Sequence, residues 1–229
     1  MFLKSKLIYI LGPEGAGKTT TANLLSHYIR SGWTDKVKIT EIRSSHLYVY
    51  LLKSLLMKLG RVEYYKYPRG FLIKRIDRLY LSRIIKFLLF AELTAIVVLA
   101  LIKVRLHLLL GYVVICTRYV IDTIIDLLAY TLVAPQGRLL VYKFIMPILL
   151  RLIPEGLPII YLDANYDVLV KRYEERNSYL EPPNWISFYR SMSRAILRAV
   201  LGHYKVVVID TSSKSRSQIF KEVLQTILT

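Results

Sequence analysis

A glycine-rich stretch near the amino terminus constrains this chain more than any other feature. Residues 12–20 read GPEGAGKTT, which fits the pattern G-x-x-x-x-G-K-[ST]. Residues 6–11 before it are apolar and β-branched, as in a buried strand, and Ala22, Leu25 and Ile29 after it have helical spacing. A phosphate-binding loop requires this setting between a strand and a helix. The sequence therefore predicts a nucleoside triphosphate site.

The residue types of this loop suit the binding of phosphate groups. Its glycines allow successive backbone N–H groups to point at a β-phosphate, and the positive end of the following helix adds to that field. Lys18 would neutralise the β- and γ-phosphates, and the hydroxyl of Thr19 would ligate Mg²⁺. A chance glycine-rich turn is the alternative, but the flanking strand and helix favour the phosphate loop. We therefore expect ATP and Mg²⁺, held by Gly12, Pro13, Glu14, Gly15, Ala16, Gly17, Lys18, Thr19 and Thr20.

Apolar, strand-like runs recur along the chain with helical segments between them. After residues 6–11 they lie at residues 37–42, 112–116, 157–162 and 204–209. Alternating strands and helices predict a mostly parallel sheet that is covered on both faces, because each crossover helix packs on the sheet. A chain of 229 residues without a linker-like stretch suits a single domain over residues 1–229. The expected fold class is the three-layer α/β/α sandwich of P-loop NTPases, with a five-stranded sheet.

The segments between the strands are predicted to be helical. We expect helices at residues 19–29, 46–59, 72–109, 122–133, 138–152, 166–177, 186–202 and 215–228, with Pro147 ending or kinking the fifth of them. Residues 61–70, rich in aromatic and basic side chains, are predicted to form a loop.

The carboxyl ends of the strands predict where the site lies, because parallel sheets bind their ligands there. Besides the phosphate loop, the residues that follow strands are Arg43, Thr117, Arg118, Tyr119, Asp163 and Asp210. The guanidinium groups among them are well suited to neutralising phosphate charge. We therefore expect Arg43 and Arg118 to lie beside the loop.

In these features the chain resembles the thymidylate kinase family of P-loop nucleoside monophosphate kinases. The loop at residues 12–20 looks like the family's phosphate loop, with an acidic residue at its third position. Residues 113–120, VVICTRYV, are similar to the family's third strand, which ends in Asp-Arg-Tyr. Residues 162–163 and 168–176 look like the family's next strand and its arginine-bearing lid helix, and residues 208–211 look like its last strand.

The resemblance implies a kinase that transfers the γ-phosphoryl group of ATP to a nucleoside monophosphate. Arg43 and Arg118 would hold the acceptor's phosphate, with Tyr119 beside them, and Glu14 would approach the acceptor's sugar. Arg172 and Arg176 would close over the transferring group as part of a lid around residues 171–190. The alternative for these two arginines is an i, i+4 pair on a solvated helix face.

One position and one segment depart from the family's pattern. Thr117 stands where the family has aspartate, so it cannot supply the carboxylate that would order Mg²⁺ or its waters. Asp122 could supply that carboxylate from the next turn, or it could cap a helix. Residues 88–96 are nearly all apolar, where the family has polar and basic residues that recognise thymine. Within them, Glu92 would either contact a substrate or pair with a basic side chain in the core.

The charge balance indicates anionic ligands or surfaces. The chain has 33 Lys and Arg against 16 Asp and Glu, a net charge of +17. This charge suits nucleotides, nucleic acid or an anionic membrane, and a solvated basic surface is the plain alternative. Nucleic acid and lipid are partners that the sequence permits without favouring them. The basic cluster that could bind them comprises Lys66, Arg69, Lys74, Arg75, Arg78, Arg83 and Lys86.

The most apolar stretch, residues 87–102, raises the question of a membrane-spanning helix. Glu92 interrupts it and two basic residues close it, so its uncharged run is shorter than the ~18 residues that a spanning helix needs. We expect it to be sheet-covering core or the surface of a homodimer. A single cysteine, Cys116, and a start that leads straight into the first strand favour a cytoplasmic protein without a signal peptide.

Two further functions fit the same sequence. One is a nucleotide-gated binding protein that acts on nucleic acid or on an anionic membrane surface. The other is a kinase with a lipid-linked acceptor. A steep dependence of binding on salt concentration would indicate a polymer of phosphates as the partner.

Overall fold

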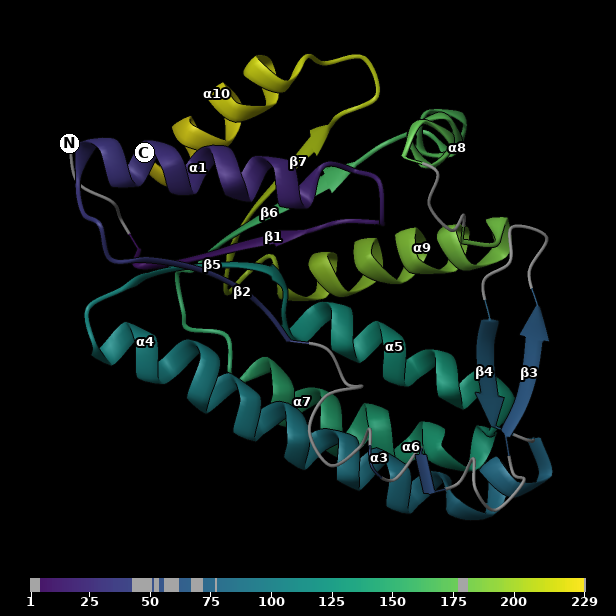
Figure 1. The fold of residues 1–229 in the computed structure, drawn as a ribbon. Helices are drawn as coiled ribbons and strands as arrows, with labels where there is room; N and C mark the ends of the chain where they lie inside the picture. Colours follow the sequence, from purple (N-terminus) through teal and green to yellow (C-terminus); the bar gives the residue numbers. More distant parts are fainter. Residues whose placement is uncertain are drawn as a thin grey trace.

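A parallel sheet of five strands lies at the centre of the structure (Figure 1). The structure, a computed structural model, describes residues 5–42, 51, 54–55, 62–66, 72–76, 78–176 and 181–228. The strands lie in the order β2-β5-β1-β6-β7, and every neighbouring pair is parallel. The sequence-based expectation of fold class is confirmed. The strands are β1 (Leu7–Leu11), β2 (Val37–Glu41), β5 (Val113–Arg118), β6 (Pro158–Asp163) and β7 (Lys205–Asp210).

The central strand β1 is buried on both faces, which explains why its sequence is apolar throughout. Successive side chains of a strand point to opposite faces of the sheet. Leu7, Tyr9 and Leu11 therefore belong to one hydrophobic core, and Ile8 and Ile10 belong to the other. The two cores make the molecule a three-layer sandwich.

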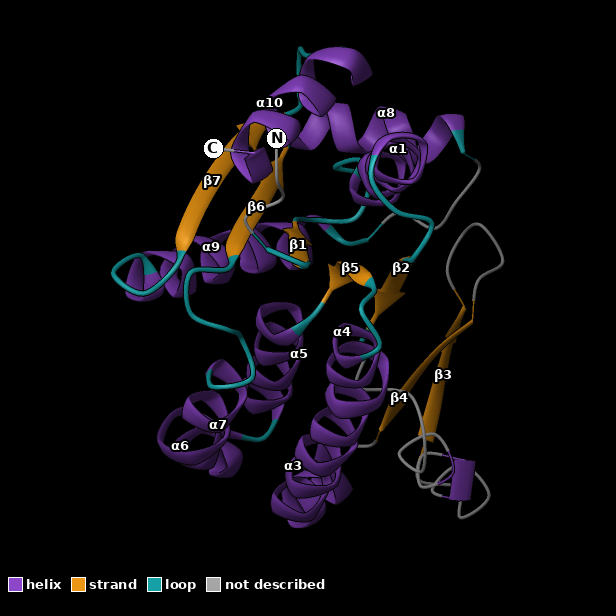
Figure 2. Cartoon of the chain, turned by 90° about the vertical axis from the view of Figure 1, so that its left-hand side faces the viewer, coloured by secondary structure: helices purple, strands orange, loops and turns teal. Residues whose placement is uncertain are grey.

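Helices cover both faces of the sheet (Figure 1). On one face lie α1, α8 and α10, and on the other α5 and α9 lie next to the sheet. In Figure 2, α3 with α4 and α6 with α7 form the layer farthest from α1 and α10, and α5 contacts both α3 and α7. The main helices are α1 (Lys18–Gly32), α3 (Arg78–Ala100), α4 (Leu106–Leu109), α5 (Val120–Val133), α6 (Arg138–Leu140), α7 (Met146–Leu150), α8 (Tyr166–Glu175), α9 (Pro183–Val200) and α10 (Arg216–Leu228).

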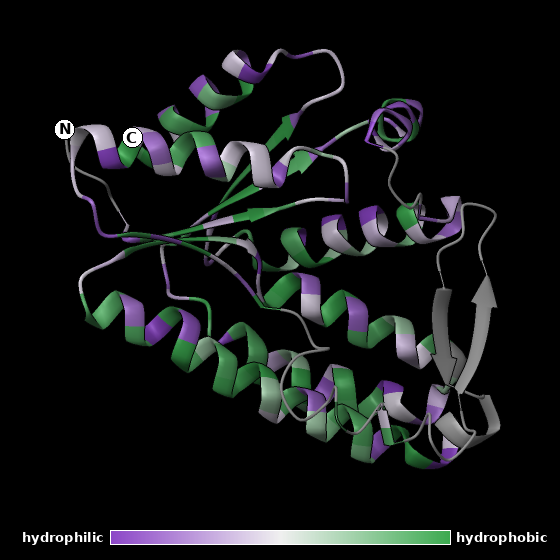
Figure 3. Ribbon diagram, viewed as in Figure 1, coloured by the Kyte–Doolittle hydropathy of each residue, from purple (hydrophilic) through white to green (hydrophobic). Residues whose placement is uncertain are grey.

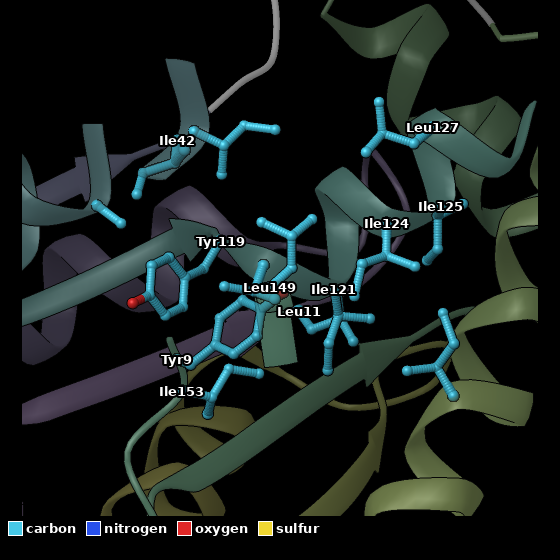
Figure 4. Close-up of a cluster of buried hydrophobic side chains, with 14 of the residues drawn as sticks. Tyr9, Leu11, Ile42, Tyr119, Ile121, Ile124, Ile125, Leu127, Leu149 and Ile153 are labelled. Carbon is cyan, nitrogen blue, oxygen red and sulfur yellow. The ribbon is translucent and has the colours of Figure 1, made fainter. Parts of the chain in front are cut away.

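The core between the sheet and α5 contains two tyrosines side by side (Figure 4). The rings of Tyr9 and Tyr119 meet edge to face, with their centroids 5.6 Å apart. Ile121 and Ile124 from α5 and Leu149 from α7 pack around them. Edge-to-face contact is a favoured geometry for aromatic pairs.

Two helices of the outer layer contain a wider, π-helical turn. The turn η1 (Leu101–Arg105) joins α3 to α4, and η3 (Val141–Ile145) joins α6 to α7. Pro147 lies in the first turn of α7, directly after η3. Proline has no backbone N–H to give to the preceding turn, so a local change of helical pitch is expected there. The helix continues to Leu150 rather than ending at the proline.

A two-stranded antiparallel sheet stands where a loop and the start of a helix were predicted. It consists of β3 (Val62–Lys66) and β4 (Leu72–Ile76), and α3 begins only at Arg78. Aromatic and β-branched side chains in residues 62–66 and a Pro-x-Gly segment between the two runs are strand and turn signals. The helix predicted over residues 72–76 and the loop predicted over residues 62–66 were wrong, because pairing between the two short runs decides their structure. The helix predicted at residues 46–59 lies almost wholly outside the described residues.

One helix in the described part of the chain, Ser82–Leu109, is long and apolar enough to cross a membrane by length and composition. Half of its apolar window is buried within the protein, however. Ile85, Leu88 and Ile96 contribute to the core beneath the sheet. The inner side of the helix therefore serves as core, as one of the sequence-based alternatives proposed.

Candidate functional site

The phosphate-loop motif forms the connection between β1 and α1. Gly15 and Gly17 have φ angles of 82° and 99°, in the left-handed region that favours glycine. Gly12 packs against the backbone of β6, where a Cβ atom would lie 2.1 Å from the carbonyl oxygen of Leu162. No side chain fits at that position. The glycines are thus required by the backbone path and by close packing on the neighbouring strand.

Lys18 begins α1 and turns its side chain back into the loop. Its Nζ donates hydrogen bonds to the carbonyl oxygens of Gly12 and Pro13, at 2.7 and 2.9 Å, and to Oε2 of Glu14 at 3.1 Å. The side chain is 5% exposed. Burial lowers the pKa of Lys18, although the charge of Glu14 acts in the opposite direction. The loop therefore holds a desolvated ammonium group at its centre.

Glu14 connects the loop to the end of β5. Its Oε1 lies 2.9 Å from Nη2 of Arg118, while Oε2 bonds Lys18. Burial would raise the pKa of Glu14, but the charges of Lys18 and Arg118 outweigh it and lower that pKa to about 2. The negative charges of Glu14 and Asp122 raise the pKa of Arg118, although its burial acts in the opposite direction. Lys18 at the start of α1 and Arg118 at the end of β5 thus share one ionised carboxylate.

Two further carboxylates, Asp126 and Glu181, interact electrostatically with Arg118. Burial raises the pKa of the partly buried Asp126 to about 7; Arg118 opposes this, and the charges of Asp122, Glu181 and Glu92 add to it. Burial also raises the pKa of Glu181. The region next to Arg118 therefore combines one guanidinium with carboxylates that hold their protons more readily than usual.

We expect the stability of the protein to depend on the protonation of Asp126. Because its folded-state pKa of about 7 exceeds the ordinary 3.8, the contribution of the protonated group is complete below about pH 4 and is lost as the pH rises through 7. Asp126→Asn removes this loss. In urea unfolding, the variant should gain stability over the wild type between about pH 5 and about pH 8. A difference between the two proteins that stays constant with pH would contradict the assignment.

Asp122 occupies a buried network of hydroxyl groups. Its Oδ2 accepts hydrogen bonds from the hydroxyl of Tyr9 at 2.7 Å and from the backbone N–H of Tyr119 at 3.1 Å. Its Oδ1 accepts one from the hydroxyl of Tyr189 at 2.6 Å. With Tyr119 it forms the capping box of α5. Of the two alternatives for Asp122, the helix cap is the one that the geometry supports.

Arg172 ties α8 to the opposite side of the loop. Its Nη1 donates to the carbonyl oxygen of Gly15 and to Oγ1 of Thr211, both at 3.1 Å, and its Nη2 donates to the carbonyl oxygen of Thr211 at 2.6 Å. Thr211 follows β7 and also bonds the carbonyl oxygen of Asp163 at 3.0 Å. Arg172 thus holds the phosphate loop against the ends of two strands.

Asp163, the last residue of β6, carries an arginine clamp. Arg190 donates to both of its carboxylate oxygens, at 2.8 and 3.1 Å, and Arg194 donates to Oδ2 at 2.6 Å. The position of Asp163 after a strand predicted that it lies near the site, but its two partners were not predicted. Their i, i+4 spacing on one side of an amphipathic helix is the signal that could have suggested them.

Comparison with solved structures places this arrangement among known folds. The chain is similar to a thymidylate kinase from Candida albicans, with 16% identity, a TM-score of 0.61 and coverage of 100% of this chain and 93% of that one. A deoxyadenosine kinase from M. mycoides with bound dCTP gives 14% identity, a TM-score of 0.59 and coverage of 96% and 97%. A thymidylate kinase from Ehrlichia chaffeensis gives 17%, 0.52, and 97% and 98%. The chain has the P-loop fold of thymidylate and nucleoside kinases. No protein-family model and no curated protein matches the sequence.

Within this fold, some of the predicted site residues come together and others do not. The loop residues 12–20 contact Arg118, at the end of β5, and Arg172, on α8. Arg176 is exposed beyond the end of α8, and its role in a lid stays a prediction. Arg43 lies outside the described residues.

Tyr119 does not point into the site. Its side chain is fully buried, and its hydroxyl donates to the carbonyl oxygen of Leu152 at 2.9 Å. The orientation of the Tyr119 side chain therefore does not support the substrate contact that was expected of it. Glu92, a residue of α3, is likewise buried, and its charge helps to raise the pKa of Asp126.

The residues present fit a Mg²⁺ ion through one side chain. Thr19 is exposed in the first turn of α1, so its hydroxyl is available beside the loop. Thr117 offers no carboxylate, and the oxygens of Asp122 already accept three hydrogen bonds. Over the described ranges, no group of three or more His, Cys, Asp or Glu side chains could hold a metal ion. A bound Mg²⁺ would therefore depend on Thr19, the nucleotide's phosphates and water.

Proposed function

We propose that this protein is a P-loop kinase that transfers the γ-phosphoryl group of ATP to a nucleotide-type acceptor, either a nucleoside or a nucleoside monophosphate. The observation that carries the proposal is the meeting of Lys18 and Arg118 on Glu14. Lys18 begins the helix that follows the loop after β1, and Arg118 ends the neighbouring strand β5. This arrangement supports a role for Lys18 at the donor and for Arg118 at the acceptor. The likeness of fold to nucleoside and thymidylate kinases supports this reading.

The donor side consists of the loop and Lys18. The backbone N–H groups of residues 15–19 and the start of α1 provide a positive field for phosphate oxygens. Lys18 already lies within the loop, and its hydrogen bonds to carbonyl oxygens can be exchanged for bonds to phosphate with a small movement of Nζ. A Mg²⁺ ion, ligated by Thr19, would neutralise the charge that develops on the β- and γ-phosphates.

The acceptor side consists of Arg118 and the carboxylates around it. The Arg118 side chain is 16% exposed and is fixed by its ion pair with Glu14, so it can bind an anionic group without much loss of side-chain freedom. Glu14, Asp126 and Glu181 can accept hydrogen bonds from sugar hydroxyls. In their ionised forms they would also repel an acceptor with several negative charges. This balance favours a hydroxyl-bearing acceptor with no more than one phosphate.

Substitution of Arg118 by lysine tests the acceptor side. Lysine keeps the charge but lacks the planar, bidentate fork, so we expect the acceptor's KM to rise about 10- to 100-fold while the KM for ATP changes little. Arg198→Lys, on the exposed side of α9, is the matched control and should leave both constants unchanged. A rise in the KM for ATP with no change in the acceptor's KM would refute the assignment of Arg118 to the acceptor.

A further inference from the structure

We propose that the cavity between α1 and β2 binds a small molecule that carries a phosphate group, at a site separate from the phosphate loop. α1 lies over the edge of the sheet that ends in β2 (Figure 2). A cavity of about 410 Å³ lies where these two elements meet, and we call it the α1–β2 groove. Its polar lining consists of Asn23, Ser26, His27, Arg30 and Lys38.

The α1–β2 groove lies away from the loop. Ser26 follows Lys18 by eight residues, which is about 12 Å along the helix axis. The side chain of Lys18 turns in the other direction, towards the carbonyl oxygens of Gly12 and Pro13. A ligand in the groove would therefore not share contacts with a nucleotide in the loop. The proposal does not depend on the reaction that the loop supports.

The polar side chains of the groove form one face of α1. Asn23, Ser26, His27 and Arg30 have the spacing i, i+3, i+4, i+7, which places them above one another on a helix. The opposite pattern, Ala22, Leu25 and Ile29, enters the hydrophobic core. In Figure 3, α1 shows purple segments of hydrophilic residues between green ones, whereas α3 and α4 are green along most of their length. The side of α1 that meets the groove is thus built from groups that bind polar ligands.

Arg30 is the fixed cation of the groove. Its Nη2 donates a hydrogen bond to the carbonyl oxygen of Val37 at 3.0 Å, which holds the guanidinium at the edge of β2. This bond uses one of five N–H donors. No ion pair among the described residues includes Arg30. The remaining donors and the uncompensated charge suit a phosphate, which arginine binds through two parallel hydrogen bonds.

Ser26 supplies a second, independent indication of a ligand. Its side chain is only 5% exposed, yet it lines the groove. Within the described part of the chain, its hydroxyl forms no hydrogen bond. A nearly buried hydroxyl without a partner is unfavourable, and an oxygen atom of a ligand would satisfy it.

The edge strand β2 contributes a second cation. Val37 and Ile39 pack towards α1 and form the apolar part of the lining. Because side chains alternate along a strand, Lys38 starts from the other face of the sheet. Its exposed, four-carbon side chain can bring its ammonium group around the open edge to the groove that it lines. No carboxylate belongs to the lining within the described residues.

This set of groups selects the class of ligand. The groove offers two cations, a hydroxyl, an amide and an imidazole, and its volume lies in the range of small-molecule sites. A neutral ligand would leave both charges without a partner. A phosphate group supplies negative charge together with several acceptor oxygens for the donors. We therefore assign the groove to a phosphate-bearing small molecule.

The experiment is a titration of the full chain, followed through the ring resonances of His27. These resonances are assigned by their loss in His27→Asn. Inorganic pyrophosphate and adenosine monophosphate serve as probes for a free phosphate group and a phosphate ester, at constant ionic strength. We expect a saturable shift with at least one of them, and the tighter probe names the source. Malonate, which has two carboxylates, should bind at least about tenfold more weakly.

Variants separate the groove from the loop and from net charge. Lys38→Gln should weaken binding at least about tenfold, because it removes a charged donor, and Ser26→Ala should weaken it about threefold to tenfold. Lys221→Gln removes the same charge from an exposed position on α10 and should bind as the wild type does. Lys18→Met should keep the His27 shift, because the groove does not include the loop. Circular dichroism checks the fold of each variant.

Four results would overturn the proposal. The first is the absence of a saturable His27 shift with both probes. The second is an equal loss of affinity in Lys38→Gln and Lys221→Gln, since net charge alone would then attract the probe. Loss of the shift in Lys18→Met would place the probe in the loop instead. Malonate binding as tight as that of the phosphates would refute the assignment to phosphate.

Discussion

Replacing Lys18 by methionine should reduce kcat/KM for ATP-dependent phosphoryl transfer by on the order of 10²–10³-fold, because it removes a preorganised positive charge from the site of the transferring group. Methionine has a similar length and shape. The substitution relieves the burial of an ammonium group, but it also removes the hydrogen bonds that Nζ donates to Gly12, Pro13 and Glu14. We expect these effects to offset each other in part, with a loss of about 1–2 kcal/mol in the free energy of unfolding.

The control for this experiment is Lys221→Met, an exposed lysine of α10, which should leave transfer unchanged. Steady-state kinetics with ATP and Mg²⁺, together with urea unfolding of each variant, give the two readouts. If the activity of the Lys18 variant stayed within about threefold of the wild type, the loop would have no essential part in phosphoryl transfer.

The second large effect is expected on stability, from Asp163→Asn. Asp163 is 7% exposed and accepts hydrogen bonds from Arg190, Arg194 and the backbone N–H of Ala164. Removing its charge leaves Arg190, which is 24% exposed, without its anionic partner. We expect a loss of about 2–3 kcal/mol, most of it from Arg190, since Arg194 is largely exposed.

Glu222→Gln provides the comparison, because it breaks the ion pair between Lys214 and Glu222, whose atoms are only 2.7 Å apart but whose side chains are 33% and 38% exposed. That change should cost less than about 1 kcal/mol. In thermal unfolding, Asp163→Asn should lower Tm by about 4–10 °C and Glu222→Gln by no more than about 3 °C. Equal shifts in Tm would show that the burial of Asp163 and its arginine partners does not add to the stability of the protein.

The fold was predictable from the sequence where the signals are local. Buried parallel strands must be apolar on both faces, so β1, β5 and β6 stand out as continuous runs, and the phosphate loop fixes what connects β1 to α1. The hairpin of β3 and β4 was missed because short runs of mixed polarity suit a strand or a helix equally well. Each run is a strand because it pairs with the other, and the periodicity of a single run does not show such pairing.

The site was predictable only in part, for a related reason. The position of Arg118 follows from the topology, because the ends of neighbouring parallel strands meet at one edge of the sheet. The hydroxyl groups of Tyr9 and Tyr189 reach Asp122 from 113 and 67 residues away. The orientation of Tyr119 towards the core is likewise set by its neighbours in space. Contacts of this kind depend on packing between elements, which local patterns do not specify.

The most direct test of the account follows the γ-phosphoryl group itself. Wild-type protein and Lys18→Met would be incubated with γ-labelled ATP, Mg²⁺ and a panel of nucleosides and nucleoside monophosphates. We predict label in the phosphorylated form of at least one acceptor with the wild type, together with an equal amount of ADP, and almost none with the variant. Release of labelled inorganic phosphate without any labelled acceptor, or transfer that is equal in the two proteins, would contradict the account.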